Sequence, residues 1–170
     1  IDHLDYFKTF ENIKNAFIKY VKLLPDDGVL VVNGDDKNCL DLIKYTNATT
    51  ITYGIENKNV DFCAQNIHFD NDGFPEFDVY YNGEFFVQIK LSVPGTHNVL
   101  NALSCIALCN HYGIEKNAIK TALLKFTGAH RRFEFKGKID NKASVYDDYG
   151  HHPTEILATA KSLSHKEYNK

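Results

Sequence analysis

The sequence has no apolar run long enough to cross a bilayer, and its first residues do not form a secretory signal. It also lacks a strong charge of either sign, because 19 basic and 22 acidic residues give a formal net charge of −3. General attraction to nucleic acid or to an anionic membrane is therefore not expected. Tryptophan and methionine are absent, a compositional bias that indicates no function. These absences predict a cytoplasmic protein with neither a nucleic-acid nor a membrane partner.

The four cysteines lack the CxxC spacing that marks many zinc sites. Cys105 and Cys109 are four residues apart in an apolar helical stretch, so they share one face of the helix. We expect two small buried hydrophobic side chains with reduced thiols, as in a cytosolic protein. A metal-binding pair completed by His111 is the alternative.

Hydrophobic residues make up 44% of the 170 residues, enough for the core of one domain or slightly more. Helical spacing of apolar residues predicts one helix over residues 4–24, with one apolar face. Strands are predicted over residues 29–32 and 49–53, with a helix over residues 37–46 between them. This alternation indicates a parallel sheet with right-handed crossovers.

The pattern then changes to antiparallel pairing. A strand is predicted over residues 60–69, followed by a hairpin whose strands, 77–81 and 84–91, flank Asn82-Gly83. Helices are expected over 99–112 and 115–126, strands over 133–139 and 143–146, and a last helix from 154. The sequence therefore predicts an α/β fold with a mixed sheet flanked by helices and an antiparallel hairpin portion. A domain boundary is expected near residues 128–133.

Four clusters of polar residues are candidates for chemistry. The first is Asp2-His3-Leu4-Asp5, where a histidine and carboxylates can hold a divalent ion. On spacing alone, a helix N-cap by Asp2 or Asp5 is the better interpretation. The second cluster is Gly95 to Ala102, where Asn98 and Asn101 lie on one side of a helix start. Their amides complement the edge of adenine, whereas capping by Thr96 or Asn98 explains only one of them.

The third cluster is Gly128-Ala129-His130-Arg131-Arg132-Phe133-Glu134. Arginine binds phosphate with a planar fork and keeps its charge. Two consecutive arginines in a strand-like segment point in opposite directions, so one is expected to face a ligand and the other solvent or Glu134. A surface salt bridge is an equally good interpretation of this cluster alone.

The fourth cluster is the most informative, the run from Val145 to Glu155. Asp147, Asp148, Tyr149, His151 and His152 gather there around one glycine, between a strand-like and a helix-like segment. Asp148 can accept both hydroxyls of a ribose, and Tyr149 can wall a pocket. His151 and His152 can orient an anion or a reacting amine at the helix N-terminus. The alternative is a solvated loop with a helix start at Pro153.

Taken in this order, the four motifs resemble the Mur ligase family of peptidoglycan synthesis over essentially the whole chain. The resemblance implies a magnesium-binding role for His3 and a phosphate-facing role for Arg132, with Arg131 as a less certain neighbour. It implies that His97, Asn98 and Asn101 contact adenine. It also implies that Asp148 binds the ribose of ATP, while the region of Tyr149, His151 and His152 receives the incoming amino acid.

The last motif is most similar to family members that join UDP-N-acetylmuramate to L-alanine, with ATP and Mg²⁺ and through an acyl phosphate. Members that use a tripeptide to recycle muropeptides typically carry Phe and Ala where this chain has Tyr149 and Gly150. A nucleotide-binding module without catalysis and a metal-binding interaction domain are rivals of other classes. Neither rival accounts for Asn98, Arg132 and Asp148 together.

The family's glycine-rich phosphate loop, Gly-x-x-Gly-Lys-Thr/Ser, does not occur in the chain. The resemblance places that loop upstream of Ile1. We therefore expect residues 1–130 to form part of a central P-loop-type ATPase domain and residues 131–170 to begin a Rossmann-like C-terminal domain. A piece of this extent is expected to have no ligase activity alone.

Overall fold

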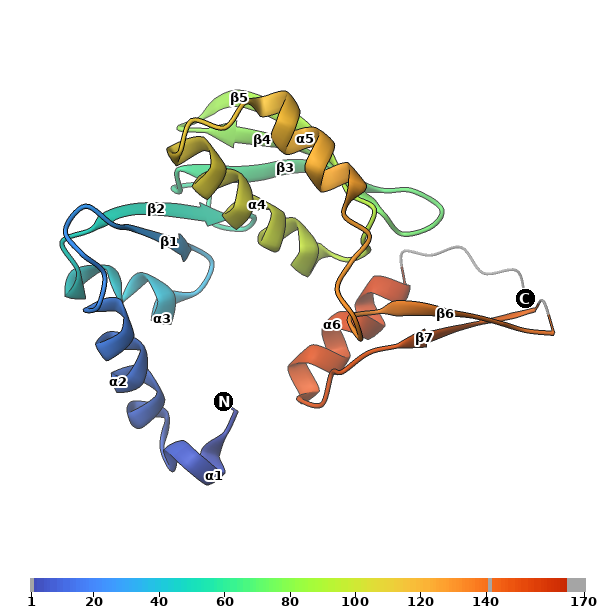
Figure 1. Ribbon diagram of the computed structural model, residues 1–170, viewed down its shortest axis with the longest axis horizontal. Helices are drawn as coiled ribbons and strands as arrows, with labels where there is room; N and C mark the ends of the chain where they lie inside the picture. The colour runs from blue at the N-terminus through green and yellow to red at the C-terminus, as the bar shows by residue number, and fades with distance from the viewer. Residues whose placement is uncertain (1, 141, 165–170) are drawn as a thin grey trace.

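The computed structural model describes residues 2–140 and 142–164, and its main layer is a five-stranded mixed sheet (Figure 1). The strands run in the order β1-β2-β3-β4-β5, with β1, β2 and β3 parallel and β3, β4 and β5 antiparallel. Their bounds are Val29–Asn33, Thr49–Gly54, Phe62–Phe69, Pro75–Tyr81 and Glu84–Lys90. The predicted mixed sheet and its antiparallel hairpin portion are confirmed.

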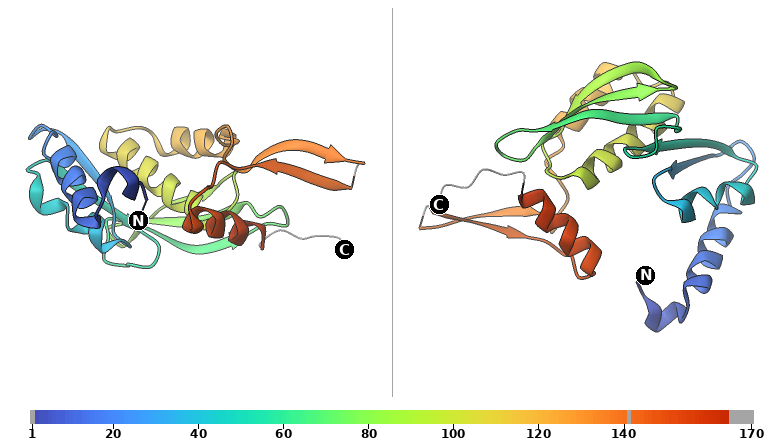
Figure 2. Two further views of the ribbon diagram at one scale, coloured as in Figure 1. Left: turned by 90° about the horizontal axis from the view of Figure 1, so that it is seen from below. Right: turned by 180° about the vertical axis from the view of Figure 1, so that it is seen from behind.

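Two helices cover one face of this sheet. Helix α4 (Thr96–His111) crosses β1 to β4, and α5 (Lys116–Lys125) packs on β5 (Figures 1 and 2). Strand β4 alternates, so that Phe77 and Val79 are buried, and α4 presents Leu103 and Ile106 to the same core. Because the sheet and the two helices share this core, the first turn of α4 is held firmly at one end of the sheet.

The prediction of a single N-terminal helix over residues 4–24 is wrong. The structure has α1 (Leu4–Phe7) and α2 (Phe10–Val21), separated by Lys8 with a φ of 65°. The Thr9 hydroxyl accepts a hydrogen bond from the backbone N–H of Asn12 at 3.2 Å, which caps α2. A side-chain cap competes with helix continuation and so breaks the periodic segment. The expected apolar face is also largely uncovered, since only Val21 of α2 is buried.

The predicted helix over residues 37–46 is also shorter than expected. It consists of α3 (Lys37–Leu40) and a separate 3-10 turn, η1 (Ile43–Tyr45). The expected cap is present, because the Asp36 carboxylate accepts the backbone N–H of Asn38 at 2.8 Å. Among the described helices, none is long and apolar enough to cross a membrane.

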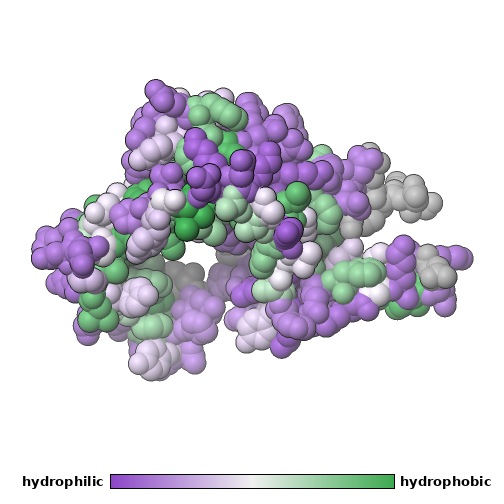
Figure 3. Space-filling view, turned by 45° about the horizontal axis from the view of Figure 1, so that its top comes forward, coloured by the Kyte–Doolittle hydropathy of each residue, from purple (hydrophilic) through white to green (hydrophobic). Residues whose placement is uncertain are grey.

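The chain then leaves the sheet and forms a second, smaller unit. Strands β6 (Glu134–Ile139) and β7 (Ala143–Asp147) make an antiparallel two-stranded sheet, followed by helix α6 (Pro153–Leu163). The hairpin projects away from the main sheet, while α6 packs near the start of α4 (Figure 2). In the space-filling view an opening separates the N-terminal helices from the β6–β7 and α6 unit (Figure 3).

Gly95, at the start of α4, permits a close approach to α6. Its φ is 94°, and a Cβ built there would lie 2.1 Å from the Ser162 Oγ atom. Gly95→Ala should therefore reduce the free energy of unfolding by roughly 1–3 kcal/mol through backbone strain and a steric clash. Urea unfolding measures this loss. Gly83→Ala is the matched control, because Gly83 has a similar φ of 83° with open space around it. Equal losses in both variants would contradict the close-approach explanation.

Candidate nucleotide site

A cavity of about 600 Å³ lies where three segments meet: the start of α4, the connector between α5 and β6 (residues 126–133), and the start of α6. This volume lies within the usual range for small-molecule sites. Its walls mix apolar side chains with a few polar groups. The lining residues are Val93, His97, Asn98, Asn101, Phe126, Gly128, Ala129, Arg132, Phe133, Asp148, Thr154, Glu155, Ala158 and Thr159. Five of the residues that the sequence motifs single out therefore converge here from two structural units: His97, Asn98, Asn101, Arg132 and Asp148.

The two asparagines lie on one side of α4, as their spacing predicts. The Asn101 amide donates a hydrogen bond to the Asn98 Oδ1 atom at 3.2 Å, and the Asn98 amide donates to the Pro94 carbonyl at 2.8 Å. The N-cap of α4 is Gly95, without a side-chain hydrogen bond, so the alternative interpretation, a cap by Thr96 or Asn98, is not what the structure shows. Because both amides are held by neighbours, they form a fixed polar edge on the cavity wall.

The surroundings of His97 favour its neutral form. Burial lowers the pKa of its imidazole below the usual 6.5, and the positive charge of Arg132 adds to the lowering, whereas Asp148 opposes it. A neutral imidazole beside the arginine leaves Arg132 as the positive group of this wall.

The lowered pKa of His97 predicts a pH dependence of stability. The unfolded chain binds a proton on this histidine more readily than the folded chain does. Its contribution is therefore fully present above pH 6.5 and is lost as the pH falls from 6.5 through the lower, folded pKa. We expect His97→Gln to flatten the dependence of the free energy of unfolding on pH in this window. Chemical unfolding at a series of pH values tests this, and an unchanged slope would contradict it.

The two arginines of the connector lie in a turn and not in the strand-like segment that the sequence indicates. Strand β6 begins only at Glu134, and Arg131 and Phe133 have φ values of 56° and 52°. The Glu134 carboxylate accepts the backbone N–H of Arg131 at 3.0 Å. This contact and a neighbouring lysine, Lys136, lower the pKa of Glu134 to about 2. Local hydrogen bonds stabilise the turn, which explains why strand alternation does not apply.

The arginines nevertheless point in different directions. Arg132 lines the cavity, and its Nη1 atom lies 3.6 Å from the Glu155 Oε1 atom. Arg131 is outside the cavity lining, with its guanidinium 4.9 Å from the centre of the Tyr149 ring and its Nε atom 3.6 Å from the Asp147 carboxylate. Of the two, Arg132 is therefore the one placed to meet an anion in the cavity.

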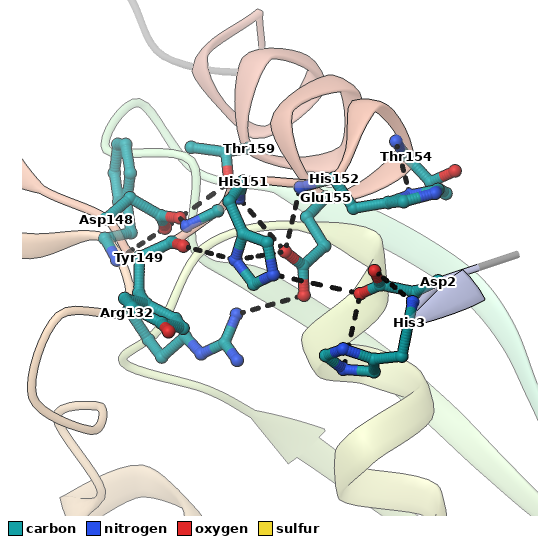
Figure 4. Close-up of polar contacts among 12 residues, drawn as sticks. Asp2, His3, Arg132, Asp148, Tyr149, His151, His152, Thr154, Glu155 and Thr159 are labelled. Carbon is teal, nitrogen blue, oxygen red and sulfur yellow. Dashed lines mark hydrogen bonds and ion pairs between the residues drawn. The ribbon is translucent and has the colours of Figure 1, made fainter. Parts of the chain in front are cut away.

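Asp148 joins the connector to the loop before α6. Its Oδ2 atom accepts the backbone N–H of Phe133 at 2.9 Å and lies 3.4 Å from the Thr159 hydroxyl, while Oδ1 accepts the backbone N–H of Gly150 at 2.7 Å (Figure 4). An ionised carboxylate has about four acceptor positions. Asp148 can therefore hold the loop and still accept a hydroxyl from a ligand in the cavity.

The loop from Tyr149 to Glu155 lies beside the cavity. His151 packs against the Tyr149 ring at 5.0 Å between ring centres, and its Nδ1 atom is 3.1 Å from the Tyr149 carbonyl oxygen. His152 is the N-cap of α6, since its Nδ1 atom accepts the backbone N–H of Thr154 at 3.2 Å. Helix α6 begins at Pro153, one residue before the predicted start at residue 154 and at the residue that the solvated-loop alternative names. The amino-acid-binding roles of Tyr149, His151 and His152 stay predictions, because none of the three lines the nucleotide cavity.

The N-terminal segment reaches the same loop. The Asp2 Oδ2 atom lies 3.8 Å from the His151 Nε2 atom and 3.7 Å from the His3 Nε2 atom (Figure 4). The expected N-cap by Asp2 or Asp5 is wrong, because His3 takes the N-cap position of α1 without a side-chain hydrogen bond. In residues 2–140 and 142–164, no three His, Cys, Asp or Glu side chains gather in a metal-binding arrangement. His3 as a magnesium ligand stays a prediction.

The cysteine pair differs from the expected buried hydrophobes. Cys105 is exposed and Cys109 half-buried, because Cys105 lies beside the face of α4 that meets the sheet. Although the residue is exposed, partial desolvation of its sulfur and the neighbouring Cys109 thiol raise the pKa of Cys105. Both thiols line a second, apolar cavity of about 340 Å³ next to Asn98 and Asn101.

Two residues of the site had no assigned role in the sequence motifs. Glu155 lines the cavity and contacts Arg132, and Thr159 lines it and contacts Asp148. Glu155 stands three residues after His152, the N-cap of α6, and this capping-box spacing indicates a helix start and not a cavity wall. Thr159 lies inside a helix, and no spacing rule indicates that it faces Asp148.

A model of the Mur ligase middle domain matches residues 1–109, so the chain belongs to the Mur ligase family. A relative from Acetivibrio thermocellus named UDP-N-acetylmuramate–L-alanine ligase is 46% identical over 167 residues, covering 98% of this chain and 35% of the relative. One of the same name from Clostridium novyi is 48% identical over 168 residues, covering 97% and 36%. The chain thus spans about a third of the length of these curated relatives.

Solved structures of Mur ligases have a fold similar to that of this chain. The structure of UDP-N-acetylmuramate–alanine ligase MurC from Thermotoga maritima has a TM-score of 0.77 and 28% identity, covering 96% of this chain and 36% of that one. MurF from Acinetobacter baumannii has a TM-score of 0.83, with 97% and 35% covered, and its 22% identity indicates the fold alone. MurF ligase from Thermotoga maritima, solved in complex with ADP, has a TM-score of 0.79 and 19% identity, with 96% and 37% covered.

Proposed function

We propose that the chain is part of an ATP-dependent ligase that forms an amide bond between UDP-N-acetylmuramate and L-alanine in peptidoglycan biosynthesis, in the cytoplasm. The observation that supports this most strongly is the cavity, where amides from α4 face an arginine and a carboxylate from the connector and loop. The names of relatives that are 41–48% identical support the choice of substrates. In this proposal ATP spans the two structural units, with adenine at Asn98 and Asn101 and ribose at Asp148.

The chemistry requires an activated carboxylate, because a free carboxylate is a poor electrophile. Phosphorylation of the lactyl carboxylate by ATP gives an acyl phosphate and ADP, and attack by the alanine amine then releases phosphate. Arg132 stabilises the negative charge of the moving phosphoryl group. Apolar walls at Val93, Phe126 and Phe133 exclude water from the nucleotide when the two units close on it.

A magnesium ion would supply further stabilisation of phosphate charge when bound. Mg²⁺ prefers oxygen ligands and keeps several waters, using one or two carboxylates and substrate phosphates. Asp2 and His3 are exposed and close together. The Asp2 carboxylate is an oxygen ligand of the kind that Mg²⁺ prefers, whereas the His3 imidazole offers a nitrogen, so substrate phosphates and waters would complete the ligand set. No step is assigned to these two residues beyond holding the ion.

We also propose that residues 1–130 belong to the central ATP-binding domain and residues 131–170 begin the next domain. The turn at Arg131 to Phe133, where the chain passes from the first unit to the second, supports this division. We expect the 170-residue piece alone to have no ligase activity, so the activity belongs to the complete protein.

The test is an assay of ADP and phosphate release by the complete protein with UDP-N-acetylmuramate. L-alanine should give rapid turnover, whereas the muropeptide-type tripeptide and a reaction without an amino acid should not. Turnover with the tripeptide alone would assign the protein to muropeptide recycling. Binding of ATP without turnover under any of these conditions would favour a nucleotide-binding module and contradict the proposal.

A further inference from the structure

Glu155 makes contacts in two directions from the third residue of α6. Its Oε2 atom accepts hydrogen bonds from the backbone N–H groups of His151 at 3.2 Å and His152 at 3.4 Å, which completes a capping box. Its Oε1 atom lies 3.6 Å from the Nη1 atom of Arg132 on the cavity wall (Figure 4). One carboxylate therefore joins the helix start to the arginine that meets the nucleotide.

The contacts continue from Glu155 to the N-terminal segment. The His151 ring lies between two carboxylates, with Nδ1 3.6 Å from Glu155 Oε2 and Nε2 3.8 Å from Asp2 Oδ2. A series of polar contacts thus runs from Asp2 through His151 and Glu155 to Arg132 (Figure 4). It crosses from the start of the chain to the second unit, along the edge of the nucleotide cavity.

We propose that Glu155 is a positioning residue for the reaction, which holds the Arg132 guanidinium and the His151 ring in one fixed arrangement. This inference rests on the proposed ligase function, because its main readout is catalysis. Arg132 is a long, flexible side chain on a turn, and it needs an anion on the cavity wall to fix its direction when no phosphate is present. Glu155 supplies that anion and is itself fixed by the two backbone N–H groups.

Capping of α6 does not by itself explain this geometry. A capping box needs only one side-chain acceptor directed at the backbone N–H groups, and glutamine serves as well as glutamate at this position. The second oxygen, directed at Arg132, adds nothing to the cap. Arg132 is 56% exposed in its side chain, and exposed ion pairs contribute little to stability. The effect of the pair should therefore be found in the rate of the reaction and not in the melting temperature.

The test uses Glu155→Gln in the complete protein, since glutamine keeps the cap and removes the charge. We expect a melting temperature close to that of the wild type. We expect kcat to fall about tenfold, because a misplaced arginine loses part of its contact with the transferring phosphoryl group, while KM for UDP-N-acetylmuramate stays unchanged. Asp41→Asn is the matched control: Asp41 is also an exposed, ion-paired carboxylate, but it pairs with Lys14 and is outside the cavity lining. Its kinetics should equal those of the wild type.

A double variant tests whether Glu155 acts through Arg132. In a protein that already carries Arg132→Ala, Glu155→Gln should lower kcat no further, because the side chain that Glu155 positions is gone. A Glu155→Gln protein with wild-type kcat would overturn the proposal. So would a loss of kcat accompanied by a clear fall in the melting temperature, because that result indicates that Glu155 only caps α6. Failure of the wild-type protein to ligate L-alanine would instead contradict the proposed function.

Discussion

Replacing Arg132 with alanine in the complete protein should lower kcat by about 10²–10³-fold, the usual cost of removing one preorganised group that stabilises transition-state charge. Arg132 is the arginine that lines the nucleotide cavity, where it lies near the neutral His97 and the carboxylate of Asp148. Its contact is expected to strengthen as the phosphoryl group moves, so kcat should change more than KM for ATP. Steady-state kinetics with varied ATP separates the two parameters.

Arg131→Ala is the control for this experiment. Arg131 lies against Tyr149 and Asp147 and is outside the cavity lining. We expect its removal to change kcat far less than the removal of Arg132. Equal losses for the two variants would contradict the assignment of Arg132 as the phosphate-facing residue.

Replacing Asp148 with alanine should have the second large effect, and it should act on two properties at once. The carboxylate accepts the backbone N–H groups of Phe133 and Gly150, so its loss leaves both donors without this partner. We expect a loss of roughly 1–3 kcal/mol in the free energy of unfolding for each donor that stays buried. We also expect KM for ATP to rise by about tenfold or more, since a hydrogen bond to a charged group contributes roughly 1.5–3 kcal/mol.

Asp148→Asn helps to separate these two effects. Asparagine keeps one acceptor oxygen, which can serve one of the two backbone N–H groups, but it loses the negative charge proposed to receive a ribose hydroxyl. A variant that regains stability while ATP use stays weak would support the ribose role. Unchanged ATP kinetics in both variants would rule out that role and leave Asp148 as a structural residue of the connector.

The sequence predicts the strands of this fold better than its helix boundaries. The β-branched run before Asn33 and the Asn82-Gly83 turn determine strands and hairpin locally, so the predicted strands occur close to the expected residues. The N-terminal helix is broken because a single hydroxyl, that of Thr9, caps a new start. Hydrophobic periodicity carries no information about such a cap, because the apolar spacing is the same on both sides of it.

The sequence singled out some of the residues that line the cavity, but not their geometry. Motif order brought Asn98, Arg132 and Asp148 into one hypothesis, and the structure places all three on one cavity. The contacts of Glu155 and Thr159 depend on how α6 packs, and no local spacing determines that packing. The exposure of Cys105 was missed for the same reason: α4 presents one face to the sheet, and sequence alone does not show where that face ends.

The central claim is that one nucleotide is held by both structural units. A crystal structure of the complete protein with a non-hydrolysable ATP analogue tests it most directly. We predict adenine at the amides of Asn98 and Asn101, the ribose hydroxyls at the Asp148 carboxylate and the terminal phosphate at Arg132. A nucleotide bound wholly within the first unit, with Asp148 making no contact to it, would contradict the claim.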